Sequence, residues 1–224
     1  YNYSEVSDLQ GISSVQASES GLPTGTGFFL ANHAVGYQPY SAWVFQQIYD
    51  EQGQPIPNAF RDLNGDNQIT NEDRYYKALR PNWTYGFTTT VNYKNFDLVA
   101  NFRGQIGGQV YNSRIITTGF TDRAIQGTSS ALNNVLNFND GIANPLYKDF
   151  NGNNTFSDYL LEDASFLRLD NITLGYKFAK FIKSSSLRIY GSVNNVFIVT
   201  KYSGQDPENF NAIDNNFYPR PRTY

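Results

Sequence analysis

The clearest pattern in the chain is an alternation of apolar and polar side chains from Trp83 to Tyr93. One parity carries aromatic and β-branched residues, whereas the other carries mainly threonine, glycine and asparagine. A period of two predicts a β-strand whose two faces meet different surroundings. Lys94-Asn95 follows as a tight turn, in which we expect the asparagine to take the left-handed conformation. The return strand begins at Phe96 and repeats the alternation as far as Arg103.

A second pair of strands is predicted near the C-terminus. Phe166 to Phe178 alternates like the first pair, but the parity of its apolar positions changes near Asp170-Asn171, which predicts a β-bulge. A short link from Ala179 to Ser186 leads into another extended stretch, Leu187 to Tyr202. An earlier candidate strand covers roughly Tyr40 to Tyr49.

The connections between these strands alternate between short and long. The links at residues 94–95 and 179–186 are short, whereas residues 50–82 and 104–164 are long and rich in Gly, Asn, Asp and Pro. Outer-membrane β-barrels combine tight periplasmic turns with long extracellular loops and strands of about ten residues. The pattern therefore favours an all-β fold, an antiparallel transmembrane β-barrel segment with long extracellular loops at 50–82 and 104–164. A soluble β-sandwich whose apolar face covers a protein core stays open as the alternative.

The two faces of the first strand pair differ in chemistry. The Thr-, Asn- and Gly-rich face suits a water-filled lumen, and the aromatic face suits lipid, with aromatic residues near both ends. We predict the following lipid-facing residues: Trp83, Tyr85, Phe87, Val91, Tyr93, Phe96, Leu98 and Phe102.

Composition narrows the range of functions. The chain has 224 residues, a net charge of -3, no cysteine and one histidine, His33. The acidic balance argues against binding of nucleic acid through a basic face, and the missing cysteines exclude disulfides and thiolate chemistry. The adjacent acids Glu72-Asp73 and Glu162-Asp163 would point to opposite faces of a strand, so we predict no enzyme activity. Because the chain also lacks methionine, we expect a processed or partial polypeptide.

The sharpest local motif is the polar loop from Asp62 to Asp73. Oxygen-bearing side chains occupy its positions 1, 3, 5, 9 and 12, and the backbone carbonyl of position 7 is available. Calcium prefers six to eight oxygen ligands, and this spacing wraps them around one point, as in a dockerin-type loop. The predicted structural calcium ligands are Asp62, Asn64, Asp66, Gln68, Thr70 and Asp73. The alternative is a loop of Asx-turns without metal.

The order of several motifs along the chain is informative. Val35-Gly36-Tyr37 precedes the Asp62 loop, and Pro81-Asn82-Trp83-Thr84-Tyr85-Gly86-Phe87 follows it. A later motif is Leu161-Glu162-Asp163-Ala164-Ser165-Phe166-Leu167-Arg168. The C-terminal tail contains Asp206-Pro207-Glu208 and Tyr218-Pro219-Arg220-Pro221-Arg222-Thr223-Tyr224. From about Val35 to Tyr224 the chain resembles the C-terminal barrel region of the SusC/RagA family of TonB-dependent outer-membrane transporters.

The resemblance implies part of a 22-stranded barrel with an internal plug. It also implies a SusD-like surface lipoprotein as partner, and import of glycans or peptides driven through TonB. Residues 1–224 contain no plug, no TonB-contacting segment and no closing strand of that pattern, so we expect an incomplete C-terminal part of such a barrel. The substrate-binding residues cannot be named from the sequence. Two alternatives remain: a non-transporting scaffold subunit with this barrel, and a secreted soluble calcium-binding β-domain.

Overall fold

The computed structural model describes residues 1–17, 29–118, 154–182, 185–209, 211–214 and 220–224. Strands dominate these residues, and their single α-helix, α1 (Ser113–Thr118), has six residues. Among the described residues, no helix is long and apolar enough to cross a membrane. The predicted all-β class is therefore confirmed.

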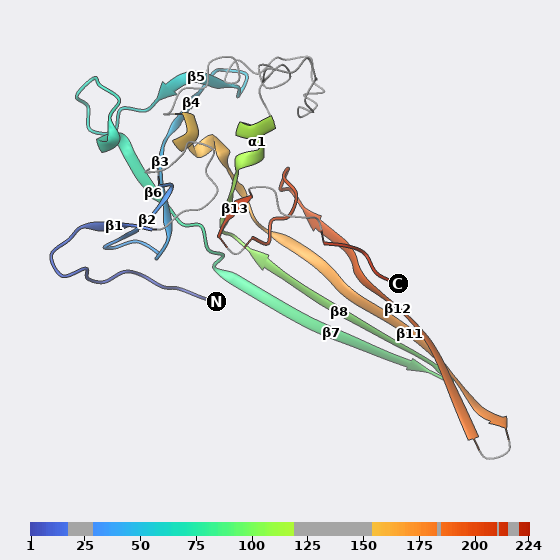
Figure 1. Cartoon of the computed structure of the whole chain (residues 1–224). Coiled ribbons are helices and arrows are strands. Elements are labelled where there is room, and N and C mark those ends of the chain that lie inside the picture. The colour runs from blue at the N-terminus through green and yellow to red at the C-terminus, as the bar shows by residue number, and fades with distance from the viewer. Residues whose placement is uncertain (18–28, 119–153, 183–184, 210, 215–219) are drawn as a thin grey trace, which may run out of the picture.

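Four long strands form one antiparallel sheet. They are β7 (Trp83–Tyr93), β8 (Phe96–Ile106), β11 (Phe166–Ile182) and β12 (Ser185–Thr200), and they lie in the order β12-β11-β8-β7. Figure 1 shows them as a long twisted sheet from which the β11–β12 hairpin extends beyond the tip of β7 and β8. Both predicted strand pairs are confirmed. The predicted turn chemistry is wrong in one detail, because Lys94 and not Asn95 has the positive φ, 54°.

The predicted bulge lies in β11. Leu169 is opposite Phe102 and Asn171 is opposite Asn101, so Asp170 is one extra residue between two consecutive partners on β8. This extra residue reverses the parity of β11. As a result, Leu167 and Leu169 share one face of the sheet with the even-numbered apolar residues from Ile172 onward.

The other strands form a small β body at one end of this sheet (Figure 1). One of its sheets contains β1 (Ser14–Gln16), β2 (Ala31–Ala34), β3 (Ser41–Phe45) and β6 (Arg74–Lys77), in that order. A second contains β10 (Leu161–Asp163), β9 (Gln109–Asn112) and β13 (Ile213–Asp214), and β4 (Gln47–Tyr49) pairs with β5 (Pro55–Phe60). The short 3-10 helices are η1 (Asn71–Asp73), η4 (Asn154–Phe156) and η5 (Asp158–Leu160).

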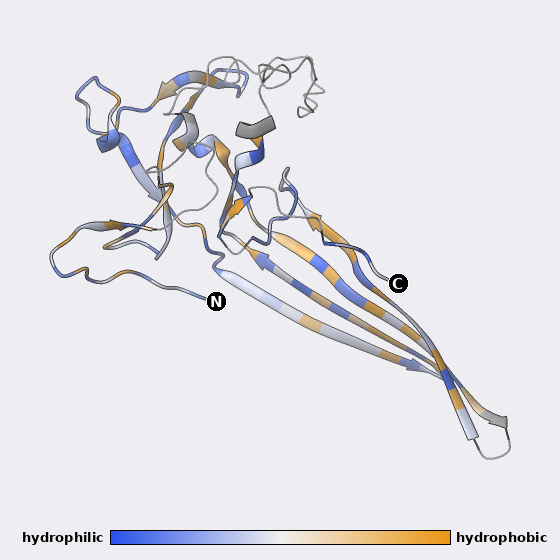
Figure 2. Cartoon of the chain, in the orientation of Figure 1, coloured by the Kyte–Doolittle hydropathy of each residue, from blue (hydrophilic) through white to orange (hydrophobic). Residues whose placement is uncertain are grey.

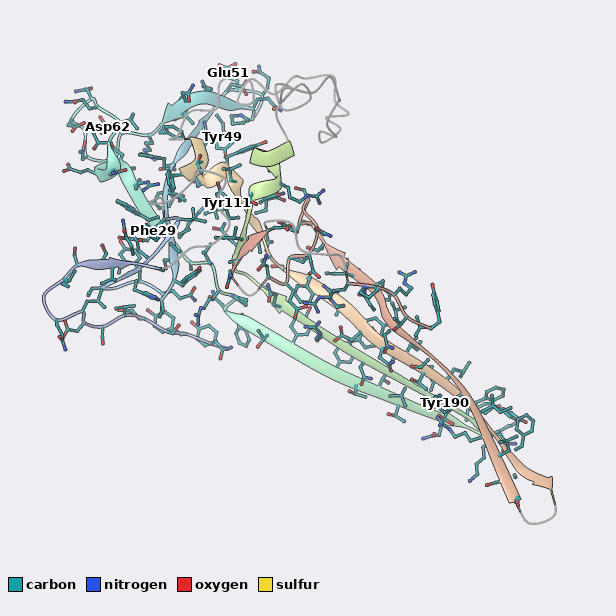
Figure 3. All side chains as sticks on the ribbon, in the orientation of Figure 1. Phe29, Tyr49, Glu51, Asp62, Tyr111 and Tyr190 are labelled. Carbon is teal, nitrogen blue, oxygen red and sulfur yellow. The ribbon has the colours of Figure 1, made fainter. Side chains whose placement is uncertain are left out.

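The β body has its own apolar core. Its buried residues come from distant parts of the chain and include Leu30, Val44, Phe45, Phe60, Tyr111, Phe156 and Ile213. Figure 3 shows Tyr111 inside this body, and its hydroxyl donates a hydrogen bond of 2.7 Å to the carbonyl of Thr155. The segments 50–82 and 104–164 thus supply strands and core residues as well as surface loops. Residues 119–153 of the second segment lie outside the described residues.

The single strand predicted from Tyr40 to Tyr49 is wrong, because the chain changes sheet at Gln46. β3 pairs with β2 and β6, whereas β4 pairs with β5. The buried side chain of Gln47 stabilises the change, since its Nε2 donates to the carbonyls of Ile48, Ile56 and Ala59.

Candidate functional site

One face of the four-stranded sheet is apolar on every strand. The register places Trp83 opposite Ile106, Phe87 opposite Phe102 and Val91 opposite Leu98. Residues directly opposite one another share a face. All eight residues predicted to face lipid therefore lie on this one face, here called the apolar face: Trp83, Tyr85, Phe87, Val91, Tyr93, Phe96, Leu98 and Phe102.

β11 and β12 continue the apolar face. On β11 the register pairs apolar residues with apolar residues of β8: Leu169 with Phe102, Ile172 with Ala100, Leu174 with Leu98 and Tyr176 with Phe96. Aromatic rings contact one another across the strands, with ring centroids 4.6 Å apart for Phe87 and Phe102 and 4.7 Å apart for Phe96 and Tyr176. Six of the eight predicted residues are exposed, and Phe87 keeps 52% of its surface accessible. Figure 2 shows the alternation of hydrophobic and hydrophilic residues along these strands. An exposed apolar surface of this kind is typical of a face that contacts a membrane or another protein.

A glycine allows one tyrosine of the apolar face to reach across a neighbouring strand. Tyr85 on β7 lies over Gly104 on β8, and its hydroxyl donates to the carbonyl of Phe166 on β11 at 3.2 Å. A Cβ on Gly104 would overlap that hydroxyl and that carbonyl. The contact therefore joins three strands at one point.

The opposite face, here called the polar face, carries amide, hydroxyl and charged side chains. Thr88 donates to the Oδ1 of Asn101 at 2.7 Å, and Asn171 bonds Ser192 and Asn194 on β12 at 2.8 Å each. Arg103 on β8 is directly opposite Arg168 on β11. Two like charges in register destabilise a sheet unless carboxylates lie between them.

Three carboxylates compensate these arginines in what we call the ion cluster, formed by Arg103, Arg168, Asp170, Asp206, Glu208 and Arg220. The guanidinium of Arg103 bonds Asp170 and Glu208. Arg168, whose side chain is only 3% exposed, bonds Asp206 at 2.8 Å. Arg220 contacts Asp206 at 3.2 Å and Glu208 at 2.9 Å. The cluster is balanced, with three positive and three negative side chains.

The ion cluster fastens the segment after β12 to the sheet. Asp206, Glu208 and Arg220 all belong to this segment. Further along it, Arg222 donates to the carbonyl of Val196 at 2.6 Å, and the backbone of Thr223 pairs with Asn194. The segment thus covers the irregular stretch of β12 around Asn195, which has a φ of 52°.

Sequence reasoning did not identify the ion cluster as a site. The motifs of the family resemblance include Arg168 and the Asp206-Pro207-Glu208 run, but their spacing in the sequence does not predict that they meet. One signal was available: the bulge at Asp170 fixes which parity of β11 lies on the polar face, and that parity includes Arg168.

The Asp62 loop lies at the edge of the β body, where Figure 3 labels Asp62. It is a series of Asx-turns. Asp62 accepts the N–H of Gly65 at 2.6 Å and that of Asn67 at 2.8 Å. Asn64 and Asp66 each accept the N–H two residues ahead, at 3.0 and 2.8 Å. Asn67 has a φ of 62°, so asparagine takes the turn conformation expected at that position.

Asp73 closes the loop from inside. Its carboxylate is fully buried and accepts the N–H of Thr70 at 2.8 Å, that of Leu63 at 2.8 Å and that of Asn64 at 3.4 Å. The hydrogen bond from Thr70, followed by those from Leu63 and Asn64, lowers the pKa of Asp73 below its usual value. The six predicted ligands therefore share one loop, with Asp73 directed at backbone donors.

The paired acids also have structural partners. Glu162 accepts the N–H of Ser203 at 2.8 Å and the amide of Asn112 at 2.7 Å. Asp163 accepts the N–H of Ser165 at 2.8 Å, and Glu72 accepts the amide of Asn64 at 3.3 Å. These carboxylates hold loops together.

Similar proteins include named TonB-dependent receptors. The whole chain is 36% identical to the TonB-dependent receptor SusC of Bacteroides thetaiotaomicron and covers 23% of that protein. Over 72% of its length it is 30% identical to the TonB-dependent receptor P3 of Formosa agariphila, of which it covers 16%. The chain thus spans less than a quarter of the length of either relative. No protein-family model matches the chain.

Solved structures with a similar fold belong to the same kind of protein. The RagAB peptide transporter matches 97% of this chain with a TM-score of 0.64 and 25% identity, and the match covers 25% of that chain. The RagAB peptide importer in its closed-closed state matches with the same TM-score and 24% identity, again over 97% of this chain and 25% of that one. By name, these relatives are receptors and importers. By sequence and by fold, the chain belongs to the SusC/RagA family of TonB-dependent outer-membrane transporters.

Proposed function

We propose that this chain is the C-terminal part of the barrel of an outer-membrane importer that takes up glycans or peptides with energy passed through TonB. The observation that carries the proposal is the two-faced sheet. An exposed aromatic face on all four strands suits lipid, and a polar face on the same strands suits a water-filled lumen. Four strands cannot close a transporter barrel, so import requires the remainder of a longer polypeptide.

A SusD-like surface lipoprotein is the proposed partner, because the RagAB structures that share this fold are two-component importers by name. In this arrangement the β body with its Asp62 loop lies on the extracellular side, which is also where the loops predicted at 50–82 and 104–164 would lie. A secreted soluble domain does not agree with membership of an outer-membrane family.

Growth on defined nutrients tests the proposal. The gene is deleted from its host, and growth on complex glycans or on peptides as sole nutrient is compared with growth of a strain without functional TonB. Import predicts that both strains lose growth on the same nutrient class. Unchanged uptake, together with loss of a larger outer-membrane assembly, would instead favour the scaffold role.

We also propose that the Asp62 loop binds calcium weakly as a structural ion. The oxygens of Asp62, Asn64 and Asp66 that accept one N–H each keep a second lone pair, which is the chemistry a calcium ligand needs. Asp73 fits less well, since its Oδ1 already accepts two N–H groups. In the described part of the chain, no three side chains of Asp, Glu, His or Cys are grouped so as to hold a metal ion. We therefore expect affinity in the range of extracellular modules, about 10⁻⁴–10⁻³ M.

A further inference from the structure

A cavity of about 540 Å³ opens where the β body meets the start of β7. Its walls include Tyr3, Gln38, Tyr40, Arg80, Asn211 and Ala212. A second cavity of about 300 Å³ shares Arg80 and Ala212 with it and extends to Gln105 of the polar face and to Glu208 of the ion cluster. The two cavities therefore lead from the β body toward the surface that we assign to the lumen.

Two residues of the first cavity have strained backbones. Tyr40 has a φ of 66° and Ala212 a φ of 54°, a region that L-residues other than Asn and Asp rarely adopt. Tyr40 is held there by its N–H, which donates to the Nδ1 of His33 at 3.3 Å, and Ala212 by its N–H, which donates to the carbonyl of Asn209 at 3.1 Å. Strain of this kind persists where the surroundings fix the backbone, and it gathers at ligand sites.

Arg80 gives the shared wall an unbalanced positive charge. Arg80 is exposed, and its backbone N–H donates to the Oε1 of Gln38 at 3.0 Å, which fixes its backbone and not its guanidinium. Its guanidinium forms neither an ion pair nor a hydrogen bond with any residue that the structure describes. The neighbouring ion cluster cannot neutralise it, because each carboxylate there already bonds an arginine.

We propose that this cavity binds a carboxylate group of the imported substrate, with Arg80 as the charged contact. This inference rests on the proposed function. A guanidinium offers two parallel N–H donors that match a carboxylate, and such charge-assisted pairs are about twice as strong as neutral hydrogen bonds. The side chains of Gln38 and Asn211, together with the tyrosine rings, suit the polar body next to that group. Two sources supply this chemistry: the C-terminus of a peptide and a uronic acid of a glycan.

Retention on the immobilised full-length protein, with its lipoprotein partner, tests the inference. The probes are a tryptic peptide mixture and a mixture of oligogalacturonides, each compared with its own methyl ester, which lacks the negative charge. Bound material is measured by mass spectrometry for the wild type, for Arg80→Gln and for Arg61→Gln. Arg61 is an exposed arginine outside both cavities and serves as the matched control.

We expect the wild type and Arg61→Gln to retain at least one free-acid mixture about tenfold more than its ester. Arg80→Gln should retain that acid and its ester equally. The mixture that shows the difference identifies the source of the carboxylate. Equal retention of acids and esters by the wild type, or a preference that survives in Arg80→Gln, would overturn the inference. Failure of the proposed function is separate: it would appear as absence of TonB-dependent uptake in cells even where this preference depends on Arg80.

Discussion

Arg188 on β12 forms an ion pair with Asp97 on β8 across the backbone of Gly175, which lies on the strand between them. The Nε of Arg188 is 2.9 Å from Oδ1 of Asp97, and its Nη2 is 2.5 Å from Oδ2. Gly175 is opposite Asp97 on one side and Tyr190 on the other. Because Gly175 has no side chain, the ion pair can join β12 and β8, which are not neighbours in the sheet, across the polar face.

The first prediction is that Gly175→Ala weakens the sheet. A Cβ at this position would lie 2.5 Å from Oδ1 of Asp97 and 2.7 Å from Nη2 of Arg188, so the ion pair must separate. We expect a loss of about 1–3 kcal/mol in the free energy of unfolding, typical of overpacking. Urea unfolding of the full-length protein in lipid vesicles measures it. Gly191→Ala on β12 is the control, since nothing lies within 4 Å of its added Cβ; equal losses in both variants would contradict the role given to Gly175.

Lysine in place of Phe87 tests the apolar face. Phe87 is in the middle of β7 and stacks on Phe102. If it faces the centre of the bilayer, Phe87→Lys should cost roughly 2–4 kcal/mol, because a charge would be transferred into hydrocarbon. The heat-modifiable mobility of the barrel on gels reports assembly. Thr88→Lys, one residue along on the polar face, should assemble normally, and the opposite ranking of the two variants would invert the assignment of the faces.

The ion cluster should behave as a coupled unit. Removal of Arg168 alone leaves Asp206 without its buried partner, so Arg168→Gln should destabilise the protein by about 3–5 kcal/mol and expose the segment after β12 to protease. The double variant Arg168→Gln, Asp206→Asn should recover part of this loss, since no charge is then left unpaired. Strictly additive effects in this double-mutant cycle would show that the two residues are independent.

The strands β7, β8, β11 and β12 could be predicted because their signal is local. The alternation from Trp83 to Tyr93, and the change of parity at Asp170, are visible within a dozen residues and survive in the register. Each face carries side chains of one character, so hydropathy alone indicates which residues share a face.

The β body could not be predicted in the same way, because its contacts are between distant residues and its strands are short. Asp158 accepts the hydroxyl of Tyr75 at 2.6 Å and the N–H of Gln47 at 3.0 Å, and no sequence pattern links these positions. The same applies to the ion cluster, in which Arg168 meets Asp206 only because the segment after β12 folds back. The polar composition of 50–82 and 104–164 therefore predicts loops, although these segments also contain core residues.

The buried carboxylate of Asp73 predicts an acid-sensitive loop. Its pKa is lowered from 3.8, so the ionised form stabilises the folded loop above the ordinary pKa, and this contribution is lost as pH falls through the lower folded value. Hydrogen exchange at the amides of Leu63, Asn64 and Thr70, corrected for the intrinsic rates, should show protection at pH 5 that begins to fall below the ordinary pKa of 3.8 and declines further as the pH drops through the lower folded value. In Asp73→Asn the protection should be low across this pH range. An unchanged pH profile in that variant would assign the acid sensitivity to another group.

Calcium should stiffen the same loop through other residues. Asp62→Ala with Asp66→Ala removes two of the proposed ligands and also two Asx-turn acceptors, so by itself it would loosen the loop whether or not a metal binds. Asp62→Asn with Asp66→Asn is the sharper variant, because the amide oxygens keep the hydrogen bonds to Gly65 and Gln68 while the negative charge that attracts the cation is lost. The hydrogen bond that the N–H of Asn67 donates to the second oxygen of Asp62 is lost in this variant. Proteolysis of the wild-type loop should slow in millimolar calcium and recover its rate with chelator, whereas the Asn variant should ignore both additions. A wild-type loop that is equally sensitive with calcium and with chelator would contradict calcium binding.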